Sequence, residues 1–179
     1  MLARHTTGLV VVDIQGKLAR MVHESGTLIA NCERLIKGAQ ALGLPIIQLE
    51  QNPEKIGTTV EELSPLLSNA RRISKFTFGA CDDPDFVNAI RSHDVDTWLV
   101  CGIETHICVY QTARGLARLG LKVEVVSDCV SSRARDNKTL GLDKLTRHGV
   151  ELTSLEMCLY ELVKDCRAPE FKQILELIR

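Results

Sequence analysis

Short runs of apolar residues alternate along the chain with longer amphipathic segments. The runs are 8–13 (GLVVVD), 44–50 (LPIIQLE), 97–102 (TWLVCG), 122–128 (KVEVVSD) and the weaker 149–153 (GVELT). Runs that are apolar on successive positions are typical of parallel strands covered by helices on both faces. The segments between them carry apolar residues at helical spacing, at 27–42, 84–92, 105–119, 134–147, 155–164 and 169–178. The alternation predicts an α/β fold, a three-layer α-β-α sandwich with a mostly parallel, Rossmann-like sheet of five to six strands.

One stretch, 51–77, breaks this pattern, because it contains Pro53, Gly57 and Pro65 and has no strong period. Long loops in compact domains are usually functional or contain a short helix, and we expect such a helix over 61–67. Residues 71–74 form a further candidate strand. A length of 179 residues without a linker or repeat predicts a single domain spanning 1–179.

The composition narrows the classes of protein and partner. The formal net charge of −1 gives no reason to expect a nucleic acid or an acidic membrane as partner. Hydrophobic and charged fractions of 45% and 25% are those of a globular protein and exclude a disordered chain. The first apolar stretch, 8–12, is too short for a signal-peptide core or a membrane span. We therefore expect a cytoplasmic protein.

The number and spacing of the cysteines also favour a cytoplasmic protein. Seven is an odd number, so they cannot all pair within one chain, and no C-x-x-C spacing suggests a zinc ribbon or a thioredoxin-type centre. Free, mostly buried thiols in a reducing compartment fit this pattern. We expect no metal and no other cofactor.

In open parallel sheets, ligands bind beyond the carboxyl ends of the strands, so the residues that follow each run are the candidates for chemistry. Asp13 ends the first run, where partial burial would raise its pKa toward that of a general base; it could equally cap a helix or pair with a lysine. Lys75 is followed by Phe76 and Phe78, and an ammonium held among these aromatic rings is either a site cation or that of a surface lysine with a buried stem.

Cys108 follows the third run, where Gly102 turns the chain and a helix begins near Thr105. In the first turn of a helix, we expect the helix dipole to lower the pKa of the thiol. The free amides of the same turn can bind an oxyanion. The alternative is a buried structural cysteine. Taken together, the candidates bring an acid, a cation and a thiol to one edge of the sheet.

These residues lie in motifs that resemble the isochorismatase-like, or cysteine hydrolase, superfamily, which includes nicotinamidases and N-carbamoylsarcosine amidohydrolases. The matching motifs are VVDIQ at 11–15, the Lys75 segment, and GIETHICV at 102–109 followed by QTA at 111–113. The segments EQNP at 50–53, GTTV at 57–60 and DCVSSR at 128–133 are most similar to the isochorismatase-domain-containing proteins. The resemblance covers nearly the whole chain.

The resemblance implies a catalytic triad of Asp13, Lys75 and Cys108 and a non-proline cis peptide at Ile103–Glu104. It also implies an oxyanion hole made by the Glu104 and Cys108 amides, and assembly into a homo-oligomer. Residues 48–58 contain none of the Asp and His ligands of metal-binding nicotinamidases. Isochorismate vinyl-ether hydrolases of the superfamily lack the cysteine that is present here. The resemblance therefore implies a cysteine-dependent hydrolase of a C–N, amide-type bond in a small molecule, acting through a thioester.

Nearness in sequence to the triad suggests a set of substrate-binding residues, each of which could instead serve packing: Gln15, Phe76, Phe78, His106 and Tyr110. Glu104 would favour a polar or cationic amide, and Arg133 would bind a carboxylate or cap the sheet edge. Two other functions stay open: a non-catalytic scaffold that retains the fold, and a redox sensor that uses Cys108. A nucleotide-binding module is weakly supported, because the first turn lacks G-x-G-x-x-G.

Overall fold

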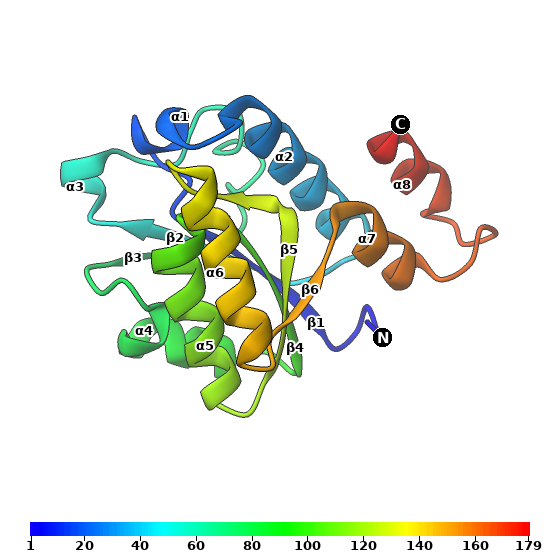
Figure 1. Ribbon diagram of the computed structural model, residues 1–179. Helices are drawn as coiled ribbons and strands as arrows, with labels where there is room; N and C mark the ends of the chain where they lie inside the picture. The colour runs from blue at the N-terminus through cyan, green and yellow to red at the C-terminus, as the bar shows by residue number, and fades with distance from the viewer.

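Six parallel strands form one central sheet in the computed structural model, which describes residues 1–179. Their order across the sheet is β3-β2-β1-β4-β5-β6, so the chain starts at the centre, builds outward to one edge and then to the other (Figure 1). All five strand pairings are parallel. The strands are β1 (Thr7–Val12), β2 (Ile46–Gln51), β3 (Arg71–Lys75), β4 (Thr97–Ile103), β5 (Lys122–Ser131) and β6 (Glu151–Thr153). The predicted α/β architecture is confirmed.

Helices cover both faces of the sheet and complete the three layers. They are α1 (Leu18–Met21), α2 (Ser25–Ala41), α3 (Pro53–Ile56), α4 (Pro84–Arg91), α5 (Tyr110–Arg118), α6 (Arg135–Arg147), α7 (Leu155–Val163) and α8 (Phe171–Ile178). One core cluster joins α2, α7 and α8 to one face, and a second joins α4, α5 and α6 to the other (Figure 1). None of the helices is both long and apolar enough to cross a lipid bilayer.

The carboxyl end of β1 lies in the middle of the sheet, against its two neighbours. Val12 is in register with Leu49 of β2 and with Gly102 of β4. Gly102 has a φ of +119°, and a Cβ built there would lie 2.0 Å from the Val12 carbonyl oxygen. Only glycine therefore lets β4 pass this close to the point where Asp13 leaves β1.

Two local predictions need correction. We expected a helix over 61–67, but the segment forms successive turns. Pro65 has no N–H to continue a helical hydrogen-bond ladder, which explains the interruption. The expected helix over 105–119 is divided, since Thr105–Val109 forms a π-helical turn (η2) before α5 begins.

All seven cysteines are free. Five of them are buried, as expected for mostly buried thiols, whereas Cys81 is half-buried and Cys166 is exposed and does not belong to the core. Cys108 differs most from an ordinary core cysteine, because it lies in η2 beside the end of β1.

Candidate active site

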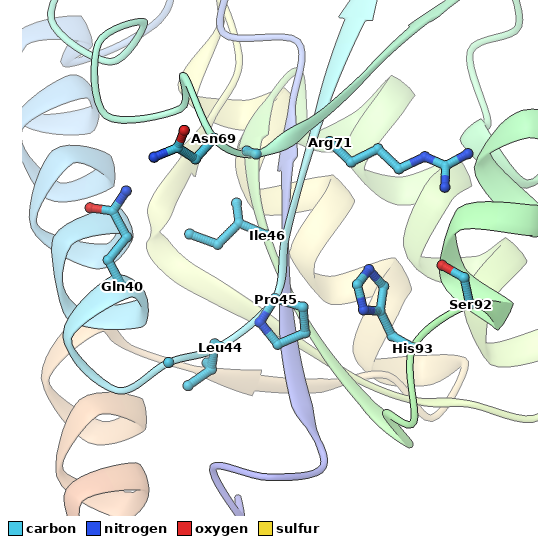
Figure 2. A pocket seen from close by; sticks show the side chains of 10 residues that line it. Gln40, Leu44, Pro45, Ile46, Asn69, Arg71, Ser92 and His93 are labelled. Atoms are coloured by element: carbon cyan, nitrogen blue, oxygen red, sulfur yellow. The ribbon is translucent and has the colours of Figure 1, made fainter.

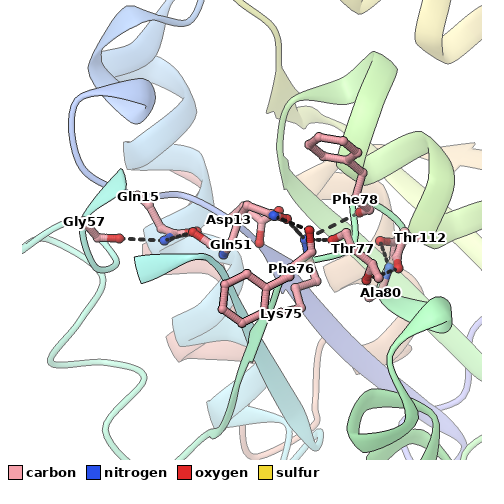
Figure 3. A network of polar contacts seen from close by, with 11 residues as sticks. Asp13, Gln15, Gln51, Gly57, Lys75, Phe76, Thr77, Phe78, Ala80 and Thr112 are labelled. Atoms are coloured by element: carbon pink, nitrogen blue, oxygen red, sulfur yellow. Dashed lines mark hydrogen bonds and ion pairs between the residues drawn. The ribbon is translucent and has the colours of Figure 1, made fainter. Parts of the chain in front are cut away.

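Asp13 and Lys75 form an ion pair at the carboxyl edge of the sheet. The Lys75 Nζ lies 2.7 Å from Asp13 Oδ2, and the two side chains are 0% and 2% exposed (Figure 3). Asp13 follows the central strand, and Lys75 ends the edge strand β3, two strands away. The extended lysine side chain therefore crosses the end of β2 to reach the carboxylate.

The Lys75 ammonium is surrounded by oxygen atoms. Besides Asp13, it donates to Gln51 Oε1 at 2.8 Å and to the Thr77 and Phe78 carbonyls at 3.2 and 3.5 Å (Figure 3). Phe76 and Phe78 are 75% and 57% exposed. The idea that aromatic rings enclose the ammonium is therefore wrong, because these phenylalanine side chains lie largely in solvent and the backbone carbonyls of the same segment take their place.

The environment of Asp13 favours a carboxyl group that can exchange a proton. Asp13 has a left-handed φ of 50°, and its Oδ1 is buried without a hydrogen-bond partner among the other residues. Burial raises the pKa of Asp13, and this effect exceeds the opposing attraction of Lys75 and the contact with the Cys108 thiol. The nearby Glu50 raises the pKa of Asp13 further.

Cys108 lies in η2, which begins at Thr105 directly after Glu104. Its side chain is buried in the core cluster that also contains Val12. Burial, followed by the charge of Asp13, raises the pKa of the Cys108 thiol to about 12, although Lys75 opposes the shift. The expected lowering by a helix dipole is therefore wrong: desolvation and the neighbouring carboxylate are the larger effects, and the turn is π-helical.

Glu104 precedes this turn and is linked to the previous residue by the expected cis peptide, Ile103–Glu104. Its carboxylate is buried and accepts two hydrogen bonds from Arg133, from the backbone N–H at 3.0 Å and from Nε at 3.1 Å. The carboxylate that Arg133 binds is thus one of the protein's own. Glu104 is already paired, so it is not a free anion for a cationic substrate.

The remaining predicted substrate-binding residues occupy different surroundings. Gln15 is fully buried, and its amide group bonds to the Gln51 and Gly57 backbone, so it holds the loop after β2 in place (Figure 3). His106 Nδ1 lies 3.0 Å from Ser132 Oγ. The Tyr110 ring lies 5.0 Å from the Lys144 ammonium. The hydrogen bonds of Gln15 therefore hold a loop in place. For Gln15 and for the other residues predicted to bind substrate, that role stays a prediction.

Gln51 is the residue of this site that sequence reasoning missed. It accepts a hydrogen bond from Lys75 and donates one from Nε2 to the Phe76 carbonyl at 2.7 Å. The signal for it was its place at the end of β2, between the strands that supply Asp13 and Lys75. Gln51 therefore fixes the direction of the ammonium and the backbone of the segment that follows it.

A sizeable cavity of the molecule lies away from this site. It has a volume of about 680 Å³ and lies where β2 and β3 begin, at the opposite end of the sheet (Figure 2). Leu44, Pro45 and Ile46 form its floor, with Arg71 and His93 at its sides. No group of three or more His, Cys, Asp or Glu side chains is arranged to hold a metal ion anywhere in the protein.

The parallel sheet with a buried Asp–Lys pair beside a thiol is the arrangement expected of isochorismatase-like hydrolases. Residues 7–157 match the family model described as the isochorismatase domain. The chain therefore belongs to the isochorismatase family.

Three known proteins illustrate the similarity. Isochorismatase domain-containing protein 1 of Salmo salar is 34% identical over 175 residues, which are 97% of this chain and 61% of that protein. The chain thus spans about three fifths of the length of this relative. The structure of MAR1 ribonuclease from Caenorhabditis elegans superposes with a TM-score of 0.93 at 32% identity, covering 99% of this chain and 91% of that one.

The third is the YcaC gene product of Escherichia coli, described as an octameric hydrolase of unknown specificity. It superposes with a TM-score of 0.89 at 22% identity and covers 98% of this chain and 94% of its own. At this identity the likeness shows a shared fold.

Proposed function

We propose that the protein is a cysteine-dependent hydrolase that cleaves a C–N, amide-type bond of a small molecule through a thioester intermediate. The observation that carries this proposal is the buried Asp13–Lys75 ion pair, 2.7 Å long, which lies close enough to Cys108 for both of its charges to shift the pKa of the thiol. A base, a cation and a nucleophile in one desolvated site are the parts that such a reaction needs.

The first step activates the nucleophile. With a pKa of about 12, the Cys108 thiol carries its proton at neutral pH. Asp13, whose pKa is raised toward that of a useful base, takes this proton as the sulfur attacks the substrate carbonyl carbon. The buried Lys75 ammonium offsets the negative charge that moves onto the sulfur. Attack and proton transfer are therefore coupled, and no persistent thiolate is required.

The following steps return the enzyme to its starting state. The carbonyl oxygen becomes an oxyanion, which the backbone N–H groups of Glu104 and Cys108 would bind. The C–N bond then breaks, Asp13 gives its proton to the leaving nitrogen, and a thioester remains on Cys108. Water attacks the thioester carbon while Asp13 accepts a proton from the water. The C–S bond then breaks and the acid is released, and the sulfur takes the proton back from Asp13, which restores the thiol and the carboxylate.

The exposed phenylalanines suggest how the site is bounded. Phe76 and Phe78 place two apolar rings beside Lys75 and would line the entrance for an apolar part of the substrate. His106 and Tyr110 flank the nucleophile in sequence and would form the wall next to the amide. Neither a metal nor another cofactor takes part in this proposal.

Phe76 and Phe78 also support a homo-oligomer, because large exposed apolar side chains often mark contacts between subunits. Assembly would cover them and narrow the entrance to the site. We place the protein in the cytoplasm, where seven unpaired cysteines remain reduced. A small molecule, rather than a nucleic acid or a membrane, is the partner that the near-neutral charge favours.

A library of small primary amides, with ammonia release as the readout, tests this proposal. Wild-type protein should release ammonia from a subset of the amides, and Cys108→Ala should release none. Cys166→Ala, which changes an exposed thiol, serves as the matched control and should keep full activity. An RNA oligonucleotide belongs in the screen, since one structural neighbour is described as a ribonuclease.

Mass spectrometry of quenched reactions should detect the acyl adduct on Cys108. Turnover by the Cys108→Ala protein would contradict the mechanism. An inactive wild-type protein with a reversibly oxidised Cys108 would instead support the redox sensor. The structure favours the hydrolase, because a buried thiol with a raised pKa is a poor target for oxidants.

A further inference from the structure

A second cavity lies on the other face of the sheet from Cys108. Its volume is about 450 Å³, and it is lined by residues of β2, of β3 and of the turns that follow Thr58. Ile47 and Leu49 of β2 pack in the same core cluster as Cys108. The alternating residues Gln48 and Glu50 therefore point to the opposite face, where they line this cavity. We call it the Glu50 cavity.

Glu50 brings a carboxylate without a cation into this cavity. The residue is 2% exposed, and no Lys, Arg or His forms an ion pair with it. Its Oε1 accepts from the Thr59 N–H at 2.8 Å, the Thr59 hydroxyl at 2.9 Å and Gln48 Nε2 at 3.4 Å. No group of the protein donates to Oε2. One oxygen of a nearly buried carboxylate is thus left for a ligand.

Other acceptors in the cavity are also free. Gln48 uses Nε2 for its hydrogen bonds to Thr59 and Glu50, and nothing donates to its Oε1. The Ser64 and Ser68 side chains line the cavity and form no hydrogen bonds within the protein. An ammonium group has three N–H donors and no acceptor, so it matches a carboxylate oxygen, an amide oxygen and a hydroxyl.

Arg72 supplies the opposite charge at the same cavity. It is exposed and lies on β3 in register with Gln48, and its side chain forms no hydrogen bond or ion pair with another residue. Glu50 and Arg72 are one strand and two residues apart, which is about 8 Å between their Cα atoms. The Glu50 carboxylate and the Arg72 guanidinium line the same cavity but do not pair with each other. A ligand with a positive end and a negative end could therefore bind to both.

We propose that the Glu50 cavity binds a small zwitterion, an amino acid whose ammonium group bonds to Glu50 and Gln48 and whose carboxylate pairs with Arg72. A volume of about 450 Å³ is that of a small-ligand pocket. Charge-assisted hydrogen bonds at both ends would give selectivity over ligands that carry one charge. The site is separate from the proposed hydrolytic site and does not depend on it.

Isothermal titration calorimetry with 4-aminobutyrate tests this proposal, and butylammonium and butyrate serve as probes that each lack one charge. Wild-type protein should bind 4-aminobutyrate at least tenfold more tightly than either. Glu50→Gln, which keeps an acceptor for Thr59, should weaken binding of 4-aminobutyrate at least tenfold. Arg72→Gln, at an exposed position, should weaken binding of 4-aminobutyrate but leave that of butylammonium unchanged.

Cys108→Ala should bind 4-aminobutyrate as the wild type does, which separates this site from the hydrolytic one. The proposal is overturned if wild-type protein gives no binding heat with 4-aminobutyrate. It is equally overturned if butylammonium binds as tightly, or if Arg72→Gln leaves the affinity for 4-aminobutyrate unchanged. The Arg72 comparison decides the matter even if Glu50→Gln does not fold.

Discussion

Two buried carboxylates lie at the ends of the neighbouring strands β1 and β2, and the protein treats them differently. Asp13 is paired with the Lys75 ammonium, and its Oδ1 has no hydrogen-bond partner among the other residues. Glu50 has no cation, but three neutral N–H and O–H groups donate to its Oε1. The side chains also differ in direction, since Glu50 faces away from the layer that contains Cys108.

The difference separates two uses of a buried acid. A carboxylate held by donors on Thr59 and Gln48 secures the loop that returns after β2, and its free oxygen can receive a ligand. A carboxylate that touches a thiol and a lysine can take up and release a proton. An acidic residue at the end of a strand lies at the carboxyl edge of the sheet. The groups that contact its carboxylate then determine whether it transfers a proton or anchors a loop.

The largest effect should follow from removing the cation. Lys75→Met leaves Asp13 as an unpaired buried charge, so we expect the free energy of unfolding to fall by about 3–5 kcal/mol. Amide hydrolysis should be lost at the same time. Urea denaturation followed by fluorescence of Trp98 measures the first effect, and ammonia release measures the second.

The double variant Asp13→Leu, Lys75→Met is the control for this experiment. Replacing both charges by apolar groups removes the uncompensated charge, so most of the lost stability should return while activity stays absent. If the single and double variants were equally unstable, the ion pair would not be the cause.

A smaller loss of stability is expected at the other carboxylate. Glu50→Leu leaves the Thr59 N–H and hydroxyl without their acceptor, which should cost about 1–3 kcal/mol. Catalysis should survive in the folded protein, because Glu50 faces away from Cys108. Denaturation midpoints together with kcat on any active amide check this, and a loss of kcat equal to that of Lys75→Met would remove the distinction between the two acids.

Gln51 joins the two regions, and its replacement should have a moderate effect. In Gln51→Leu, Lys75 loses one of its acceptors, and we expect kcat to fall about tenfold with little change in KM, as for one charged hydrogen bond. Gln51→Glu retains an oxygen acceptor and should recover most of the activity. If Gln51→Leu raised KM alone, a role in substrate binding would replace the positioning role.

The smallest expected effect, and the most specific one, is the pH dependence that follows from the raised pKa of Asp13. Because the base must be deprotonated, kcat/KM should fall as the pH is lowered through a midpoint above the ordinary value of 3.8. The folded protein holds this proton to higher pH than the unfolded chain. The stability that it contributes is present below 3.8 and is lost as the pH rises to the folded pKa.

The slope of unfolding free energy against pH measures this linkage. Asp13→Asn should remove the part of the slope that lies just above 3.8, whatever its constant effect on stability. An identical slope in the variant and the wild type would show that Asp13 has an ordinary pKa.

The sheet and the placement of Asp13, Lys75 and Cys108 could be predicted because they depend on local pattern. Continuous apolar runs identify buried parallel strands, and the residue that follows each strand lies at the carboxyl edge. The Asp13–Lys75 contact follows from this topology.

The chemistry of individual groups was harder to predict, because it depends on side-chain direction and burial. The pKa of Cys108 was misjudged from the helix dipole alone, since neither its burial nor its contact with Asp13 is visible in the sequence. Gln51 was missed for the same reason, and Glu104 could not be seen to pair with Arg133. The segment 61–67 was misassigned because the expectation rested on the length of the loop and gave too little weight to Pro65.

Lys75 is carried by β3, which has only β2 as a neighbour and exposes Arg71 and Arg72. Outer strands open by local unfolding more readily than central ones, because fewer pairings must break. Each opening of β3 would draw the ammonium away from Asp13 while β1 and the nucleophile turn stay folded. Under the proposed mechanism, molecules in which β3 is open would be inactive, and amide hydrogen exchange at Ile73 and Lys75 measures the free energy of that opening.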